Sequence, residues 1–377
     1  MALQAKSGNP PTNSISAGQI IAEFGSNHPI SGNSSGSGFS IGNYRFVGAS
    51  QSNYPQQIGG LNFASIDGSP NTGTGQIPTG NNVIRFSDFY GTQLHTVVNF
   101  WSSGAGGNRL NAKGRYNNNG MIGSNNEVAV VGGFRNRPTN TKGTSVHIHV
   151  NQNIGSEKSN VQHCALRTGG WNTGTNLFVQ VGSSGRISGA GGNGGRGSVN
   201  SGNGFAGGSG TAALGVQYHP TQVNVATGGF IVGGFGGGGG GGGGFDYDKR
   251  SSRTASGGGG GGGAGIPAGL GGQEGTGGTE GGPGQAGNAT TLGEGGSGSN
   301  NGNEAFGGVG GDGGMVGNPA DIGSGGSGGE GSTSQGGAAG GAGAAVRRNT
   351  FPDGTPFTVN INNQGTMSGS TNQTGVL

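Results

Sequence analysis

Residues 181–350 contain 68 glycines in 170 positions, or 40%, and this block limits what the chain can fold into more than any other feature. Ordinary proteins carry about 7% glycine. Ordering one backbone residue costs about 1–2 kcal/mol, and glycine loses more freedom than any other residue. Because the block has few side chains to bury, only backbone hydrogen bonds, at about 0.5–1.5 kcal/mol net each, could order it.

Two uninterrupted glycine runs, at positions 236–244 and 257–263, indicate extended segments that could bond to one another through their backbones. Extended helices with three residues per turn make no internal hydrogen bonds, so packed side by side they can bond to one another. At about 3.1 Å per residue the first run would span about 28 Å, and the second would return antiparallel to it. The sequence therefore predicts packed polyglycine II helices. Collagen is excluded because no strict three-residue glycine period is kept.

A flexible linker would have the same composition, so the flanking sequence has to distinguish order from disorder. One spacing, V-x-[VI]-x3-G-x-[IM]-x-G, begins at Val179, at Val223 and again at Val359. Alternating apolar residues followed by a glycine turn are typical of a half-buried strand, so the repeat predicts three equivalent strands that pack together. The glycine block is thus expected to begin after one β strand and to end before another strand of the same set. A flexible tether does not need such flanking strands.

The composition of the whole chain excludes several classes of protein. Only 28% of residues are hydrophobic and 9% charged, against about 45–50% and about 25% in globular proteins, so an enzyme core along the whole length is not expected. A net charge of 18 − 15 = +3 does not predict nucleic-acid binding. The single cysteine, Cys164, excludes a disulfide framework and a cysteine-based zinc cluster. We expect no enzymatic activity and no cofactor.

The fold class expected is mainly β and irregular, in three regions. Residues 1–92 hold short apolar clusters separated by turn residues and predict a small N-terminal module. Residues 93–176 are the most β-like and include the alternating segment 145–150. Residues 177–377 form the glycine-rich domain, closed by a C-terminal strand. No run of 18 apolar residues and no apolar N-terminal signal occur, so we expect a protein made in the cytosol without membrane insertion.

Motifs that would carry chemistry are weak. Positions 189–194 fit G-x-G-x-x-G, but a segment with 40% glycine produces that pattern by chance. His147 and His149 alternate on a predicted strand, so both imidazoles face one way. A solvated strand face is the simple interpretation, whereas in a three-chain fibre three such pairs could supply six nitrogens to a metal ion. Cys164 follows His163 but has no orienting partner, so it is interpreted as a small buried residue.

The connector between the two glycine runs, residues 245–256, is the densest charged and aromatic cluster in the block. In an array of parallel rods it has to lie at one end, exposed to solvent. Tyrosine, arginine and aspartate on a rigid support are typical of recognition surfaces. A solubilising loop is the alternative interpretation.

Residues 16–92 resemble a small module common in phage tail proteins, through segments 20–25, 43–45 and 77–91. Residues 177–369 resemble the glycine-rich tip adhesins of T-even-like and marine phage tail fibres, through segment 185–195 and the long glycine runs. In that family, packed polyglycine II helices carry variable loops that bind the bacterial surface receptor. The resemblance therefore implies a protein of the virion tail.

What the resemblance implies for individual residues follows from the position of those loops between glycine runs. It implies a receptor-binding set formed by Asp246, Tyr247, Asp248, Lys249, Arg250 and Arg253, with Asn300, Asn301 and Phe306 second. The expected partners are a host outer-membrane protein or glycan and other tail or baseplate proteins, with a homotrimer as one assembly that the resemblance allows. Residues 1–92 would attach the chain to the virion.

Two rival functions remain open at the level of the sequence. A purely architectural virion component would use the glycine block as flexible filler. An ice-binding polyglycine protein would need flat, regular faces, and the charged insertion at 246–253 argues against it.

Overall fold

The computed structural model describes most of the chain from residue 145 onward and short parts before it. The described residues are 14–19, 57–58, 61–62, 83, 85–89, 95–100, 109–113, 128–131, 145–248, 251–302, 305–318, 320, 327–328 and 334–377. Most of the predicted N-terminal module lies outside them. Within these residues the fold is mostly β, as expected, and helix is limited to η3 (Phe86–Phe89) and single turns at 17–19 and 112–113.

Three sheets make up the β domain, and the largest has six strands. Its order is β20 (Val359–Asn363), β12 (Thr221–Val225), β9 (Asn176–Val181), β6 (Ser145–Val150), β3 (His95–Phe100) and β5 (Val128–Val131). Neighbouring strands are parallel except β3 and β5. The sheet combines strands from before and after residue 177, so the β-rich and glycine-rich regions of the sequence contribute to one structure.

The two smaller sheets of the β domain are entirely parallel. The five-stranded sheet contains β22 (Gln373–Thr374), β19 (Val346–Arg348), β11 (Ala212–Val216), β8 (Cys164–Arg167) and β4 (Leu110–Asn111). The four-stranded sheet contains β21 (Thr366–Ser368), β13 (Phe230–Val232), β10 (Arg186–Ser188) and β7 (Asn153–Ile154).

The chain visits the three sheets in a fixed rotation. Strands β6, β7 and β8 form one coil, and β9, β10 and β11 lie parallel to them in the next. Strands β12, β13 and β19 form the third coil, and β20, β21 and β22 the fourth. The β domain is therefore a three-sided parallel β-solenoid, in which each coil contacts mainly its neighbours.

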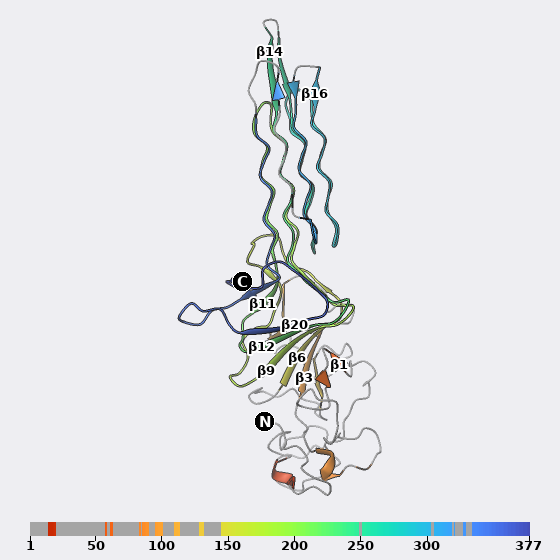
Figure 1. The fold of residues 1–377 in the computed structure, drawn as a ribbon, viewed down its shortest axis with the longest axis vertical. Coiled ribbons are helices and arrows are strands. Elements are labelled where there is room, and N and C mark those ends of the chain that lie inside the picture. The colour runs from red at the N-terminus through yellow and green to blue at the C-terminus, as the bar shows by residue number, and fades with distance from the viewer. Residues whose placement is uncertain are drawn as a thin grey trace.

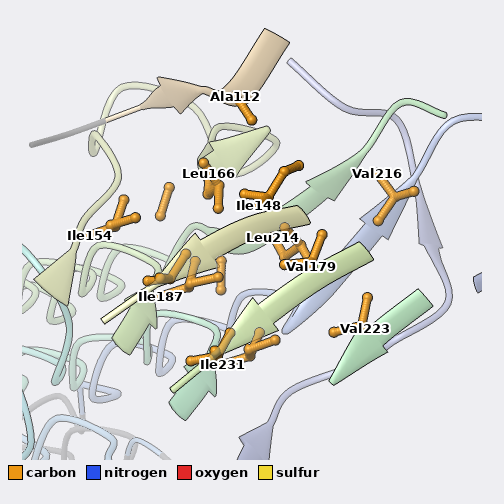
Figure 2. Close-up of a cluster of buried hydrophobic side chains, with 14 of the residues drawn as sticks. Ala112, Ile148, Ile154, Leu166, Val179, Ile187, Leu214, Val216, Val223 and Ile231 are labelled. Carbon is orange, nitrogen blue, oxygen red and sulfur yellow. The ribbon is translucent and has the colours of Figure 1, made fainter. Parts of the chain in front are cut away.

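The core of the solenoid consists of three ladders of aliphatic side chains, one from each sheet (Figure 2). They are Ile148, Val179 and Val223; Ile154, Ile187 and Ile231; and Leu166, Leu214 and Val346. All nine side chains are fully buried. Full burial of an aliphatic side chain contributes about 1.5–3 kcal/mol, so among the described residues this core is the main hydrophobic source of stability.

The repeat found in the sequence is confirmed, with one correction of register. Val179 pairs with Val223, and Ile187 with Ile231 and then Met367, as the repeat predicts. Val223, however, pairs with Ile361 rather than Val359. The corner between β20 and β21 is two residues shorter than in the preceding coil, and a shift of two keeps every side chain on its own face of the sheet. The apolar alternation cannot distinguish these two registers.

The glycine-rich sequence is inserted at one corner of this solenoid, between the four-stranded and five-stranded sheets. Nine extended segments are described there, which we call rods. They are rod 1 (189–198), rod 2 (203–211), rod 3 (233–243), rod 4 (256–264), rod 5 (268–276), rod 6 (281–288), rod 7 (292–299), rod 8 (307–314) and rod 9 (335–344). Rods 1 and 2 separate β10 from β11, and rods 3 to 9 separate β13 from β19. Figure 1 shows them running from the β domain to a distant end of the molecule.

Three small antiparallel sheets complete the described structure. The pair β1 (Gln57–Ile58) and β2 (Leu61–Asn62) lies in the N-terminal region. At the far end of the rods lie the hairpin of β14 (Gly244–Asp248) and β15 (Ser251–Ala255) and the sheet of β16 (Asn300–Asn301), β17 (Ala305–Phe306) and β18 (Ser327–Gly328). Figure 1 labels β14 and β16 at this end. We call it the tip.

Candidate functional site

The rods bond to their neighbours through backbone groups at intervals of three residues. Rod 1 shows the pattern, because the amides of Gly192, Gly195 and Ser198 donate to the carbonyls of Phe235, Gly238 and Gly241 in rod 3. The donor and acceptor numbers increase together, so rods 1 and 3 are parallel. Rods 3 and 4 are antiparallel, since Gly238 and Gly241 donate to Gly261 and Gly258. This return path was predicted from the two glycine runs.

Rod 4 is enclosed on all sides by other rods. Its amides at positions 258–263 donate in strict rotation to rods 8, 6 and 1, and its carbonyls accept bonds from rods 3, 5 and 7. A Cβ atom on Gly260 would lie 2.2 Å from the carbonyl oxygen of Gly238, and one on Gly261 would lie 1.8 Å from that of Gly293. Each glycine of rod 4, from Gly257 to Gly263, therefore faces a backbone, which explains the uninterrupted run of glycine there.

Outer rods have one direction free of neighbours and carry side chains there. In rod 1, Asn193 is exposed and Arg196 half-buried, three residues apart, while Gly194 and Gly195 pack against backbone. In rod 5, Leu270 is 61% exposed. One residue in three can thus vary on an outer rod without disturbing the hydrogen bonds.

The tip collects the connectors that follow rods 1, 3, 5 and 7, because these four rods run in the same direction. In the hairpin that follows rod 3, Asp246 pairs with Arg253 and Tyr247 with Ser252 across the two strands. Tyr247 is 61% exposed, whereas Asp246 is buried. The expected exposed aromatic residue therefore exists, and the acidic residue beside it belongs to the interior of the tip. The side chain of Asp248, and both Lys249 and Arg250, lie outside the described residues.

The second set of predicted residues lies in the neighbouring tip sheet. Asn300 is exposed, and Phe306, opposite it on β17, is 39% exposed. The amide Nδ2 of Asn301 donates to the carbonyl oxygen of Thr254 in β15 over 3.0 Å, which ties this sheet to the first hairpin. The structure thus places the described members of both predicted sets at one end of the molecule.

Two tip connectors were missed by the sequence analysis. One is the turn 199–202 between rods 1 and 2, where Val199 is 39% exposed. The other is the turn 277–280 between rods 5 and 6. The Asn200 amide of the first turn donates to the carbonyl of Thr276, the last residue of rod 5 before the second turn. Both turns could have been found from the sequence. In an antiparallel array every second connector lies at the same end, so the turns that follow rods 1 and 5 lie at the same end as the hairpin that follows rod 3.

His147 and His149 lie on β6, on the face opposite the core residue Ile148. Both are buried, with exposures of 3% and 0%, so the interpretation as a solvated strand face is wrong. The ring of His147 stacks on Phe178 at 4.7 Å and lies 2.9 Å, Nδ1 to Nε2, from Gln180. Burial lowers the pKa of His149 to about 3, which keeps this imidazole neutral at physiological pH.

The metal site at these histidines stays a prediction. A neutral imidazole is the form that binds metals. Within the described part of the chain, no three His, Cys, Asp or Glu side chains lie close enough together to hold an ion.

Cys164 is fully buried on β8, as the sequence analysis expected. Burial raises the pKa of its thiol to about 12, against the lowering effect of Arg347, Arg167 and Arg109. The thiolate is the reactive form, so we expect labelling by a thiol reagent at pH 8 to be about 1,000-fold slower in the folded protein than in guanidinium. Immediate labelling of the folded protein, followed by absorbance, would contradict this burial.

Among the described residues no helix is long and apolar enough to cross a membrane. The remaining evidence on identity comes from comparison with known proteins.

A family model described as "Phage tail fibre adhesin Gp38" matches residues 118–372, or 255 of 377 positions. The match includes most of the β-solenoid, all nine rods and the tip. No curated protein matches the chain. A solved structure, "Crystal structure of the gp37-gp38 adhesin tip complex of the bacteriophage S16 long tail fiber", is 20% identical, with 61% of this chain and 71% of that chain covered. Its TM-score of 0.24 is too low to support an argument about the fold. On the family match, the chain belongs to the phage tail fibre adhesins.

Proposed function

We propose that this adhesin recognises the host cell through its tip, and that the rods form a polyglycine II sandwich that holds the tip rigid. The observation that supports this most directly is rod 4, in which each amide from Gly258 to Ala264 donates to a backbone carbonyl of another segment. A three-residue helical repeat directs successive amides toward different neighbours, as this bonding needs. Regular bonding of every one of these backbone amides is not expected of a flexible filler.

The tip has the character of a recognition surface. Tyr247 and Phe306 present aromatic surface to solvent on short hairpins whose bases continue directly into the hydrogen-bonded rods. Aromatic side chains on a preorganised support bind partners at low entropic cost. The proposed ligand is an outer-membrane protein or glycan of the host, since both bind aromatic surfaces.

The other partners proposed are tail or baseplate proteins. Residues 1–92 would attach the chain to the virion. A homotrimer is one form that this attachment could take.

The tip assignment is tested with phage that carry Tyr247→Ala together with Arg250→Ala. We expect adsorption to the host to fall at least about 100-fold, because hot-spot residues of this kind contribute about 2 kcal/mol or more each. The adsorption rate constant is measured from the decline of free phage.

A matched control removes the same residue classes from the side of the rods. Phe205→Ala with Arg196→Ala takes an exposed aromatic from rod 2 and an arginine from rod 1. This control should adsorb normally. Normal adsorption by the tip variant, or an equal loss in the control, would remove the tip hairpin from the receptor-binding surface.

A further inference from the structure

Rod 3 contains three buried backbone amides whose acceptors are not among the described residues. They belong to Gly236, Gly239 and Gly242 and follow one another at intervals of three residues. The other amides from position 234 to 241 donate in turn to rods 2 and 4. Buried backbone amides are almost always hydrogen-bonded in folded proteins. A regular row of three such amides therefore indicates a further neighbour of rod 3.

The rods already described leave one side of rod 3 without a neighbour. Rod 3 donates to rods 2 and 4 and accepts from rods 1, 8 and 9, whereas the enclosed rod 4 bonds to six other rods. A helix with three residues per turn directs its donors in three directions and its acceptors in three others. The three amides therefore point toward a sixth position beside rod 3. Rods 8 and 9 flank this position, because rod 8 also bonds to rod 4 and rod 9 also bonds to rod 2.

The spacing of these amides specifies the conformation of the sixth neighbour. At about 3.1 Å per residue they recur about every 9.3 Å along rod 3. In a β-strand, the carbonyl groups on one edge recur about every 6.6–6.8 Å, since every second residue points the same way. A polyglycine II segment has the matching three-residue repeat and can accept from all three amides.

The directions of rods 8 and 9 require a segment that returns to the tip. Gly308 and Gly314 donate to Gly242 and Gly236, so rod 8 is antiparallel to rod 3. Rod 9 is also antiparallel to rod 3, with the same decreasing order of acceptors. Both rods therefore run from the tip toward the β domain. The chain between them, residues 315–334, has to cross the height of the rods in the opposite direction.

The length of that return path leaves almost no slack. Ala320 lies at its lower end, since a Cβ atom on Gly314 would be 2.9 Å from the Ala320 amide nitrogen. Ser327 lies at the tip, opposite Phe306. From Phe306, rod 8 covers this height in 314 − 306 = 8 residue steps, or about 25 Å. The return path has 327 − 320 = 7 steps, which reach about 25 Å only when the chain is fully extended.

The sequence of the return path has the pattern of an outer rod. Polar residues recur at every third position, namely Asp321, Ser324, Ser327 and Glu330. Glycine occupies every position between them except that of Ile322. The row at positions 320, 323 and 326 contains no side chain larger than a methyl group, so this row can pack against the backbone of rod 3.

We propose that residues 320–327 occupy the sixth position beside rod 3 as a tenth rod, and that this rod accepts hydrogen bonds from the three amides. Residues 321–326 lie outside the described residues. The tenth rod leads directly into β18, which pairs with Ala305 and Phe306 of β17. It would thus hold in place the strand that supports Phe306 at the tip, a role that rests on the function proposed above.

The test is residue-resolved amide exchange of the full-length protein, measured by NMR. We expect the three amides of rod 3 to exchange as slowly as that of Gly238, which donates to rod 4. Gly323→Val places a branched side chain between the tenth rod and rod 3, so exchange at the three amides should accelerate at least about 100-fold. Ser324→Val is the matched control, because position 324 belongs to the polar row, and it should leave this exchange unchanged. If Gly323→Val fails to fold, Gly323→Ala replaces it, with an effect in the same direction.

Three outcomes would overturn the proposal. The three amides could exchange as fast as those of Ala206 and Ser209 in rod 2, which have no described acceptor, or the two valine substitutions could act equally. The third outcome concerns protein concentration, because a segment of the same chain protects these amides at any dilution. Protection that is lost on dilution would assign the sixth position to a second copy of the chain. These readouts do not involve the host, so they are independent of the tip assignment.

Discussion

Gly261→Ala should destabilise the folded protein by about 3 kcal/mol or more, although it adds only one methyl group. The added Cβ would lie 1.8 Å from the carbonyl oxygen of Gly293, and the next nearest atoms also belong to backbone. Backbone cannot move aside by a side-chain rotation. Rods 4 and 7 would have to separate, and the bonds that Gly262 and Gly259 form with rod 7 would be broken.

Gly341→Ala is the matched control for this substitution. Gly341 lies in outer rod 9, is exposed, and would place its Cβ 3.7 Å from the hydroxyl oxygen of Ser209, an ordinary contact. Alanine there reduces the entropy of the unfolded chain, so stability should rise by about 0.4–1 kcal/mol. Denaturant unfolding of both variants gives the comparison. Equal stability of the two would mean that rod 4 is not enclosed.

The sequence predicted those parts of the fold whose interacting segments are close together in the chain, and it did not predict the others. The antiparallel return of the run 257–263 beside 236–244 followed from chain length and glycine geometry, and it is confirmed. The triangular path of the solenoid was not predicted, because its coils are joined across insertions as long as residues 233–345. No local pattern indicates that β13 and β19 belong to the same coil.

The prediction of the candidate site has a similar limit. Residues 245–256 stood out because their charge and aromatic content contrast with the glycine around them. Composition alone could not show that Asp246 is buried while Tyr247 is exposed, since this depends on the neighbouring tip sheet. The alignment of β8 and β19 on either side of β11 was also invisible to the sequence analysis. Arg167 and Arg347 are 180 residues apart and come together only through Gly215.

Amide hydrogen exchange should show a three-residue pattern in the outer rods and none in rod 4. In rod 4 each amide from Gly258 to Ala264 has a backbone acceptor. In rod 2, Gly204, Phe205, Gly207 and Gly208 donate to neighbouring rods, whereas Ala206 and Ser209 have no acceptor among the described residues. We expect exchange in rod 4 to be slowed by about four orders of magnitude or more, as in a structured core.

Residue-resolved exchange measured by NMR separates this arrangement from its alternatives. Fast exchange at Ala206 and Ser209 beside slow exchange at Gly207 and Gly208 would identify a lattice in which successive amides of a rod point toward different sides. The amides that point toward a neighbouring rod would then be protected, and those that point toward solvent would not. Uniform protection of rod 2 would instead place another segment over its outer side. Complete exchange within seconds throughout residues 189–344 would make the block a flexible tether. The tip could then not be held rigid, and recognition would have to be sought on the β-solenoid.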